Sequence, residues 1–202
     1  IDSVPKALRT HSRENSDAAL TLFYALALDA AAQLSGWLIR NHGANDNTDY
    51  RRLNSWYSML HASVISTFHA SFWNPERGAY ASYIVNGRPV HYSELVNALA
   101  LYAGAVPDGY KADTAMLLTG KRWPNLIGYK EEIAEIAPGC PDYFVPVTLS
   151  HSVFKYEALC RIGDEYAEYV FNDIASKWGY MLYNGATSFW ETDRKSTRLN
   201  SS

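Results

Sequence analysis

The residues SDAALTLFYALALDAAAQLSGWL, at positions 16–38, decide what kind of fold this chain can form. Apolar side chains recur here at steps of three and four, which is the spacing of one face of a helix. The opposite face is also apolar, and a helix that is apolar nearly all round needs neighbours on two sides. We therefore predict a buried helix, suited to the inner ring of a double ring of helices, with Ser16 as its N-cap.

Helical spacing continues along the rest of the chain. A second helix is predicted at 48–72, where one side is polar and suits an outer position. Four further helices are predicted at 93–103, 108–118, 150–162 and 165–178. Residues 120–147 are predicted to form a long excursion with one short helix at 129–136.

Asn86-Gly87 lies between two short extended runs, 80–85 and 88–91, and predicts a β-hairpin with a two-residue turn. The chain is therefore predicted to be all-α, with about three helical hairpins in a row and one short β-hairpin. Half of a double helical ring fits this order of elements, and so does a freestanding helical module.

Near its end the chain joins a helix, a glycine turn and a carboxylate. The helix ends in aromatic residues from Trp178, and Gly185 allows a backbone conformation that is closed to most other residues. Glu191 follows Trp190, and a carboxylate beside an indole loses part of its hydration, which tunes it for proton transfer. The indole face also suits the apolar face of a sugar ring.

The segment Gly-Ala-Thr-Ser-Phe-Trp-Glu at 185–191 resembles the Gly-Ala-Thr-Thr-x-Trp-Glu signature of the α-L-rhamnosidases of glycoside hydrolase family 78. Segments 72–80, 93–101 and 148–159 stand in the order that this family shows, although six-hairpin glycosidases share them more loosely. The resemblance runs from about Ser16 to Thr192. It implies a partial (α/α)6 barrel, the toroid of the six-hairpin glycosidases, and it implies no cofactor.

The resemblance also implies a reaction: release of terminal rhamnose with inversion, in which Glu191 acts as the general base on the attacking water. Inversion needs a second carboxyl group that protonates the leaving oxygen. No segment here matches the family's acid region, so the chain by itself is expected to be inactive. Two alternatives stay open, namely another six-hairpin glycosidase acting on glucosides or uronides, and a helical carbohydrate-binding or interaction module without catalysis.

Three residues are predicted to contact the carbohydrate substrate. Trp190 adjoins the proposed base and suits a wall of the sugar site. His91 and Glu94 stand at the start of a predicted inner helix, where the mouth of such a barrel forms. They serve equally well as a polar cap on that helix, and Ser93 is able to cap it alone.

The two ends of the chain look foreign to the fold. Residues 193–202 resemble the translation of a sequencing adapter, so the partial catalytic domain is predicted to be 1–192. Ile1 stands where an initiator methionine would, which predicts a piece of a longer protein and leaves its compartment open. Residues 193–202 carry three positive charges and one negative, so the net charge of −3 becomes −5 for 1–192.

The acidic balance leaves no basic patch, and nucleic acid is not an expected partner. The longest apolar run, Ala18–Leu28, is too short to span a membrane and ends at Asp29, so no membrane association is predicted either. His61 and His69 have no acidic ligands at suitable spacing, and no metal site is predicted. The cysteines, Cys140 and Cys160, are expected to be free thiols.

Overall fold

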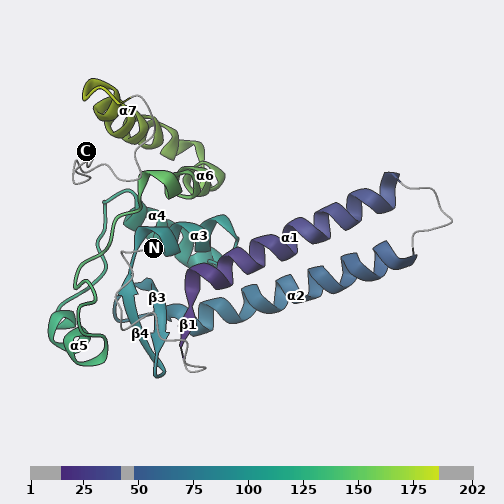
Figure 1. The fold of residues 1–202 in the computed structure, drawn as a ribbon, viewed down its shortest axis with the longest axis horizontal. Coiled ribbons are helices and arrows are strands. Elements are labelled where there is room, and N and C mark those ends of the chain that lie inside the picture. Colours follow the sequence, from purple (N-terminus) through teal and green to yellow (C-terminus); the bar gives the residue numbers. More distant parts are fainter. Residues whose placement is uncertain (1–14, 42–47, 187–202) are drawn as a thin grey trace, which may run out of the picture.

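The computed structural model describes residues 15–41 and 48–186 and is built mainly of helices (Figure 1). In chain order the elements are β1 (Ser16–Asp17), α1 (Ala18–Asn41), α2 (Thr48–Phe72), β2 (Trp73–Asn74), β3 (Ala79–Val85), β4 (Arg88–Tyr92), α3 (Glu94–Tyr102), α4 (Asp108–Leu118), α5 (Tyr129–Ile136), the 3₁₀ turn η2 (Leu149–His151), α6 (Ser152–Ile162), the 3₁₀ turn η3 (Asp164–Tyr166) and α7 (Ala167–Tyr183). The predicted helical fold with one short β-hairpin is confirmed.

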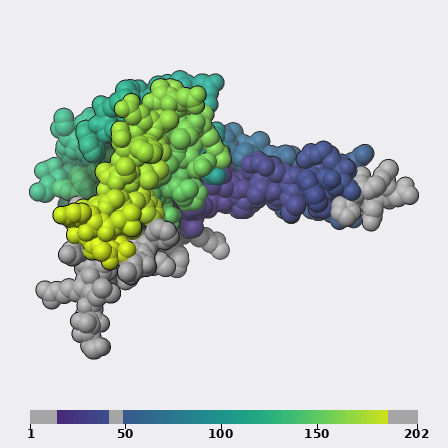
Figure 2. All heavy atoms as spheres, turned by 90° about the horizontal axis from the view of Figure 1, so that it is seen from above, coloured from purple at the N-terminus to yellow at the C-terminus, as the bar shows by residue number. Residues whose placement is uncertain are grey.

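Helices α1 and α2 form an antiparallel hairpin that projects as a long arm from the rest of the molecule (Figures 1 and 2). One stripe of α1 is buried, and it includes Leu22, Ala25 and Leu28. The opposite stripe is exposed along the length of the helix, at Leu20, Phe23, Tyr24, Leu34 and Trp37. The prediction that α1 is buried on two sides is therefore not met within the described residues. Most of the opposite face is exposed there, and Phe23 packs edge-on against Phe154 with the ring centres 5.5 Å apart.

The start of α1 also differs from the prediction. Ser16 and Asp17 pair with β3 as a short strand, and the Asp17 carboxylate accepts a hydrogen bond from the Leu20 N–H (3.0 Å). Asp17 thus satisfies a free N–H of the first helical turn, which is the role predicted for Ser16. An acceptor at this end also complements the helix dipole.

Helix α1 is the one helix among the described residues that is long and apolar enough to cross a membrane by length and composition alone. Part of it is buried inside the protein, against α2, α3 and β3. A mostly buried core helix of a soluble protein and a signal sequence near the N-terminus both meet the same criterion.

A small antiparallel sheet connects the arm to the remaining helices. Strand β3 is central, with β4 on one side and the short strands β1 and β2 also paired to it. The β3–β4 turn is formed by Asn86 and Gly87, both with positive φ (51° and 75°), as the sequence predicted. Most of β3 is buried, so the hairpin belongs to the core and is not a surface flap.

Among the described residues the hydrophobic core has three clusters, and α3 contributes to two of them. One lies between α1, α2, β3 and α3 and contains Leu22, Phe68 and Leu99. Another joins α3, α4, α6 and α7 through side chains that include Leu118 and Leu159. The third packs the β-hairpin against the 120–147 excursion.

Arg77 fixes this excursion to the hairpin. The residue is 8% exposed, and its guanidinium donates to the carbonyls of Ile127 (2.9 Å) and Asn125 (3.3 Å) and pairs with Glu132. These partners lie about α5, which forms where the sequence predicted a short helix. One buried arginine thus orders a segment that has little secondary structure of its own.

Candidate functional site

The candidate base Glu191 and the aromatic wall Trp190 lie outside the described residues, and the structure describes the chain leading to them. Helix α7 continues past its predicted end at Trp178 to Tyr183. It stops at Gly185, whose φ is 74°. The Gly185 N–H donates to the Leu182 carbonyl (3.0 Å) and the Ala186 N–H donates to the Met181 carbonyl (3.0 Å).

This pair of hydrogen bonds is a Schellman C-cap, which needs a residue in the left-handed conformation at the position of Gly185. The predicted turn at Gly185 is therefore confirmed. The cap fixes the direction of the backbone as far as Ala186, five residues before Glu191 in the sequence. The orientation of α7 consequently determines the position and direction of the backbone at Ala186, where the 187–191 segment begins.

Glu94, predicted to contact sugar, lies in the first turn of α3 with both carboxylate oxygens engaged. Its Oε2 accepts a hydrogen bond from the Val147 N–H (3.0 Å), and its Oε1 accepts one from Lys155 Nζ (3.2 Å). Ser93 caps the helix by accepting from the Val96 N–H (3.4 Å), as predicted. The carboxylate therefore joins the start of α3 to the segment before α6, while its contact with sugar stays a prediction.

Sequence reasoning missed the partner of Glu94. Lys155 is 2% exposed, and its ammonium faces Glu94 and, at 4.0 Å, Asp173 of α7. A signal was present in the sequence, because Lys155 is three, four and seven residues from Ala158, Leu159 and Ile162, on the apolar stripe of α6. A lysine at such a position has to find a negative partner inside the protein.

Two tyrosines complete the surroundings of Lys155. The Tyr156 hydroxyl donates to Asp173 Oδ2 (2.9 Å), and Lys155 Nζ lies 5.3 Å from the centre of the Tyr169 ring. Burial and the nearby Asp173 carboxylate raise the pKa of Tyr156 well above its usual range. Burial, with the same carboxylate, raises the pKa of Tyr169 to about 12. Both tyrosines are neutral at physiological pH and act as a donor and as an aromatic face.

His91, also predicted to contact the sugar, has different neighbours. It has a φ of 59°, and its backbone N–H donates to the Tyr129 hydroxyl. Its ring packs edge-on against Tyr83 with the ring centres 5.6 Å apart, and Nδ1 is buried without a partner among the described residues. Burial lowers the pKa of His91 to about 4, so the ring is neutral at pH 7. His91 and Glu94 thus belong to two different contact networks, and a sugar contact from His91 stays a prediction.

A polar group precedes α6 directly. The hydroxyls of Thr148 and Ser150 lie 3.0 Å and 3.1 Å from Nδ1 of His151, and all three side chains are exposed. This group follows Val147, the residue that donates to Glu94. It offers donors and acceptors near the start of α6. These residues lie in the 148–159 segment that resembles the family, and the sequence predicted no site role for them.

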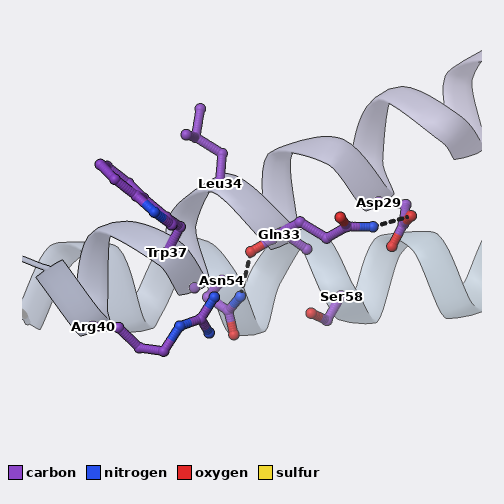
Figure 3. A pocket seen from close by; sticks show the side chains of 9 residues that line it. Asp29, Gln33, Leu34, Trp37, Arg40, Asn54 and Ser58 are labelled. Carbon is purple, nitrogen blue, oxygen red and sulfur yellow. Dashed lines mark hydrogen bonds between the residues drawn. The ribbon is translucent and has the colours of Figure 1, made fainter.

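A groove of about 590 Å³ lies elsewhere, along the outer part of the α1–α2 arm (Figure 3). Asp29 and Gln33 are hydrogen-bonded to each other on its wall, and Asn54 of α2 donates to the Ala32 carbonyl of α1 (2.6 Å). Leu34 and Trp37 point from α1 away from α2 (Figure 3). The groove contains neither His91 nor Glu94, and its lining comes only from α1 and α2.

Among the described residues there is no group of three or more histidine, cysteine or acidic side chains placed to hold a metal ion. Cys140 and Cys160 are both free thiols, one buried and one exposed.

No protein-family profile and no curated protein matches the chain. Among solved structures, the crystal structure of a GH78 family rhamnosidase of Bacillus sp. GL1 superimposes on it with a TM-score of 0.63 and 22% sequence identity. The superposition covers 87% of this chain and 15% of that chain, so this chain spans a small part of that protein's length. A likeness at this identity establishes the fold, which is that of a partial (α/α)6 helical toroid.

Proposed function

We propose that residues 1–192 form part of the catalytic domain of an inverting glycoside hydrolase that releases terminal α-L-rhamnose. One observation carries the proposal: the 185–191 signature begins in the cap that ends α7, in a chain whose fold is like that of a GH78 family rhamnosidase. The signature and the fold are independent of each other, since one is a local sequence and the other a chain-wide arrangement. On this proposal residues 193–202 are not part of the domain.

Glu191 is the general base of the proposed reaction. Its carboxylate takes a proton from the attacking water, while a carboxylic acid on the other side of the glycosidic bond protonates the leaving oxygen. Trp190 forms a wall against the apolar face of the sugar. Because this chain shows no match to the family's acid segment, we expect no turnover from the chain alone, and carbohydrate binding is the property to measure.

A rhamnose-configured iminosugar provides the test, because its ammonium group pairs with a carboxylate that faces the anomeric centre. We expect Glu191→Gln to weaken binding about tenfold or more in calorimetric titration, as expected for the loss of one charge-assisted hydrogen bond. Glu168→Gln is the matched control, since Glu168 is an exposed glutamate of the first turn of α7. In a protein that also carries the acid, Glu191→Gln should lower kcat about a hundredfold or more.

Equal affinity of the Glu191→Gln variant and the unmodified chain would overturn the assignment of the base. A glucose-configured iminosugar that binds more tightly than the rhamnose-configured one would instead favour another six-hairpin glycosidase. Binding of neutral rhamnose that Glu191→Gln leaves unchanged would favour a carbohydrate-binding module without catalysis.

A further inference from the structure

Within residues 15–41 and 48–186, helix α7 buries few of its side chains. Of its 17 residues, Val170 and Met181 are buried, whereas Phe171 and Leu182 are more than 70% exposed. Two polar side chains of the helix, at its start and middle, reach neighbouring elements. Tyr169 donates to the Leu118 carbonyl (3.0 Å), and Asp173 faces Tyr156 and two lysines.

Four charged side chains meet at this junction, and their charges balance. Lys155 of α6 lies between Glu94 of α3 and Asp173 of α7, at 3.2 Å and 4.0 Å. Lys177 pairs with Asp173 from the surface side at 3.0 Å and is 23% exposed. The side chains of Glu94 and Asp173 are only 12% and 14% exposed, so water screens their charges poorly.

Removing the charge of Lys155 would leave two shielded carboxylates facing the same space. Like charges in such a place repel one another, and the more weakly packed element moves. Glu94 is held by α3, much of which is buried in the core, while Asp173 belongs to the exposed α7. The helix that yields is therefore α7, whose capped end leads into residues 187–191.

We propose that Lys155 is a positioning residue that holds α7 against α3 and α6 by neutralising Glu94 and Asp173, and thereby places Glu191. The proposal rests on the proposed function for the role of Glu191, and Lys155 itself contacts no substrate. Lys155 acts by fixing the orientation of α7, and that orientation sets the direction in which the chain enters the signature segment. Displacements of about 1 Å at a reacting group are enough to cost a hundredfold in rate.

The test uses the chain with its own tryptophans as reporters. The chain has 6 tryptophans, and their indole N–H signals in NMR spectra can be assigned by single Trp→Phe variants. Trp178 and Trp190 report on α7 and the segment after it, while Trp37 and Trp56 lie on the distant arm. We expect Lys155→Met to shift the first pair and to leave the second pair in place.

Two further variants separate positioning from general damage. Lys177→Met is the matched control, because it removes a positive partner of the same Asp173 at the surface and leaves Lys155 in place; we expect the Trp190 signal to stay where it is. Lys155→Met combined with Asp173→Asn removes the repulsion. The amide oxygen of the introduced asparagine can still accept a hydrogen bond from the Tyr156 hydroxyl. We expect Lys155→Met to lower the iminosugar affinity about tenfold. The double variant should return the Trp190 signal most of the way to its position in the unmodified chain, and its affinity should be within about threefold of that chain's.

An unmoved Trp190 signal in Lys155→Met overturns the proposal, and so does a double variant that is no closer to the unmodified chain than Lys155→Met. If Lys155→Met does not fold, the repulsion argument requires that the double variant does, and failure of both overturns it. If the iminosugar does not bind at all while the indole signals behave as expected, the positioning role stands and the proposed function fails.

Discussion

The side chain of Asn97 pairs with the backbone of Tyr80 as a neighbouring strand would. Its Oδ1 accepts from the Tyr80 N–H (3.0 Å), and its Nδ2 donates to the Tyr80 carbonyl (3.2 Å). The Asn97 side chain is fully buried and joins α3 to β3, the strand at the centre of the sheet. Backbone groups buried without partners are costly, so this amide satisfies a requirement of the fold.

We expect Asn97→Ala to destabilise the protein by about 3 kcal/mol, because it leaves the N–H and C=O of Tyr80 unpaired in the core. Urea unfolding followed by circular dichroism measures the change. Asn172→Ala, at an exposed position of α7, is the control and should stay within about 0.5 kcal/mol of the unmodified chain. A loss below about 1 kcal/mol for Asn97→Ala would show that water or another group replaces the amide.

The protein should become less stable as the pH is lowered, because His91 titrates. Burial lowers its pKa to about 4 in the folded chain, below the usual value of 6.5. As the pH falls, the unfolded state therefore binds the proton first. The free energy of unfolding decreases between about pH 6.5 and pH 4, by about 3 kcal/mol at most. Below pH 4 the folded state is protonated too and the loss levels off.

His91→Asn removes this titration, and asparagine tolerates the positive φ of the position. The difference in unfolding free energy between the two proteins should shift in favour of the variant across pH 6.5 to 4. Carboxylates that titrate in both proteins cancel in the difference. Parallel stability curves would show that the pKa of His91 is the same in the folded and unfolded chain, contrary to the expected effect of burial.

Arg77 should control the order of the excursion that contains α5. Arg77→Met leaves the carbonyls of Asn125 and Ile127 without their donor, so we expect hydrogen exchange of the α5 amides to accelerate about tenfold or more. Arg88→Met is the control: Arg88 reaches the same Glu132 at 3.6 Å but is 51% exposed, and exposed pairs contribute little. Equal acceleration in the two variants would contradict the assignment.

Two glycines should respond to alanine in opposite directions. Gly78 has a φ of 65°, so Gly78→Ala should cost about 1–2 kcal/mol through backbone strain, while the flexible end of the Arg122 side chain shifts to make room for the added Cβ. Gly109 lies in α4 with free space around it and no positive φ, so Gly109→Ala should stabilise by about 0.5–1 kcal/mol. Thermal unfolding of the two variants side by side checks both signs, and a stabilising Gly78→Ala would refute the backbone argument.

Local rules accounted for most of the secondary structure. The 3.6-residue rhythm located the helices to within a few residues, and Asn86-Gly87 predicted the hairpin turn that forms. The end of α7 was predicted five residues too early at Trp178, because Gly179 weakens a helix without ending it. Helix α7 ends instead at Gly185, because this glycine, unlike Gly179, has the left-handed conformation that completes a C-cap.

The sequence by itself determined the helices, the hairpin and the signature at 185–191, because each depends on residues close together in the chain. The tertiary structure alone decided that Lys155 neutralises Glu94, that Arg77 holds α5 and that burial keeps His91 neutral. These contacts join residues 38 to 61 positions apart. Periodicity shows which face of an element is apolar, but the charge or hydration of a buried polar group depends on the distant side chains that packing brings to it.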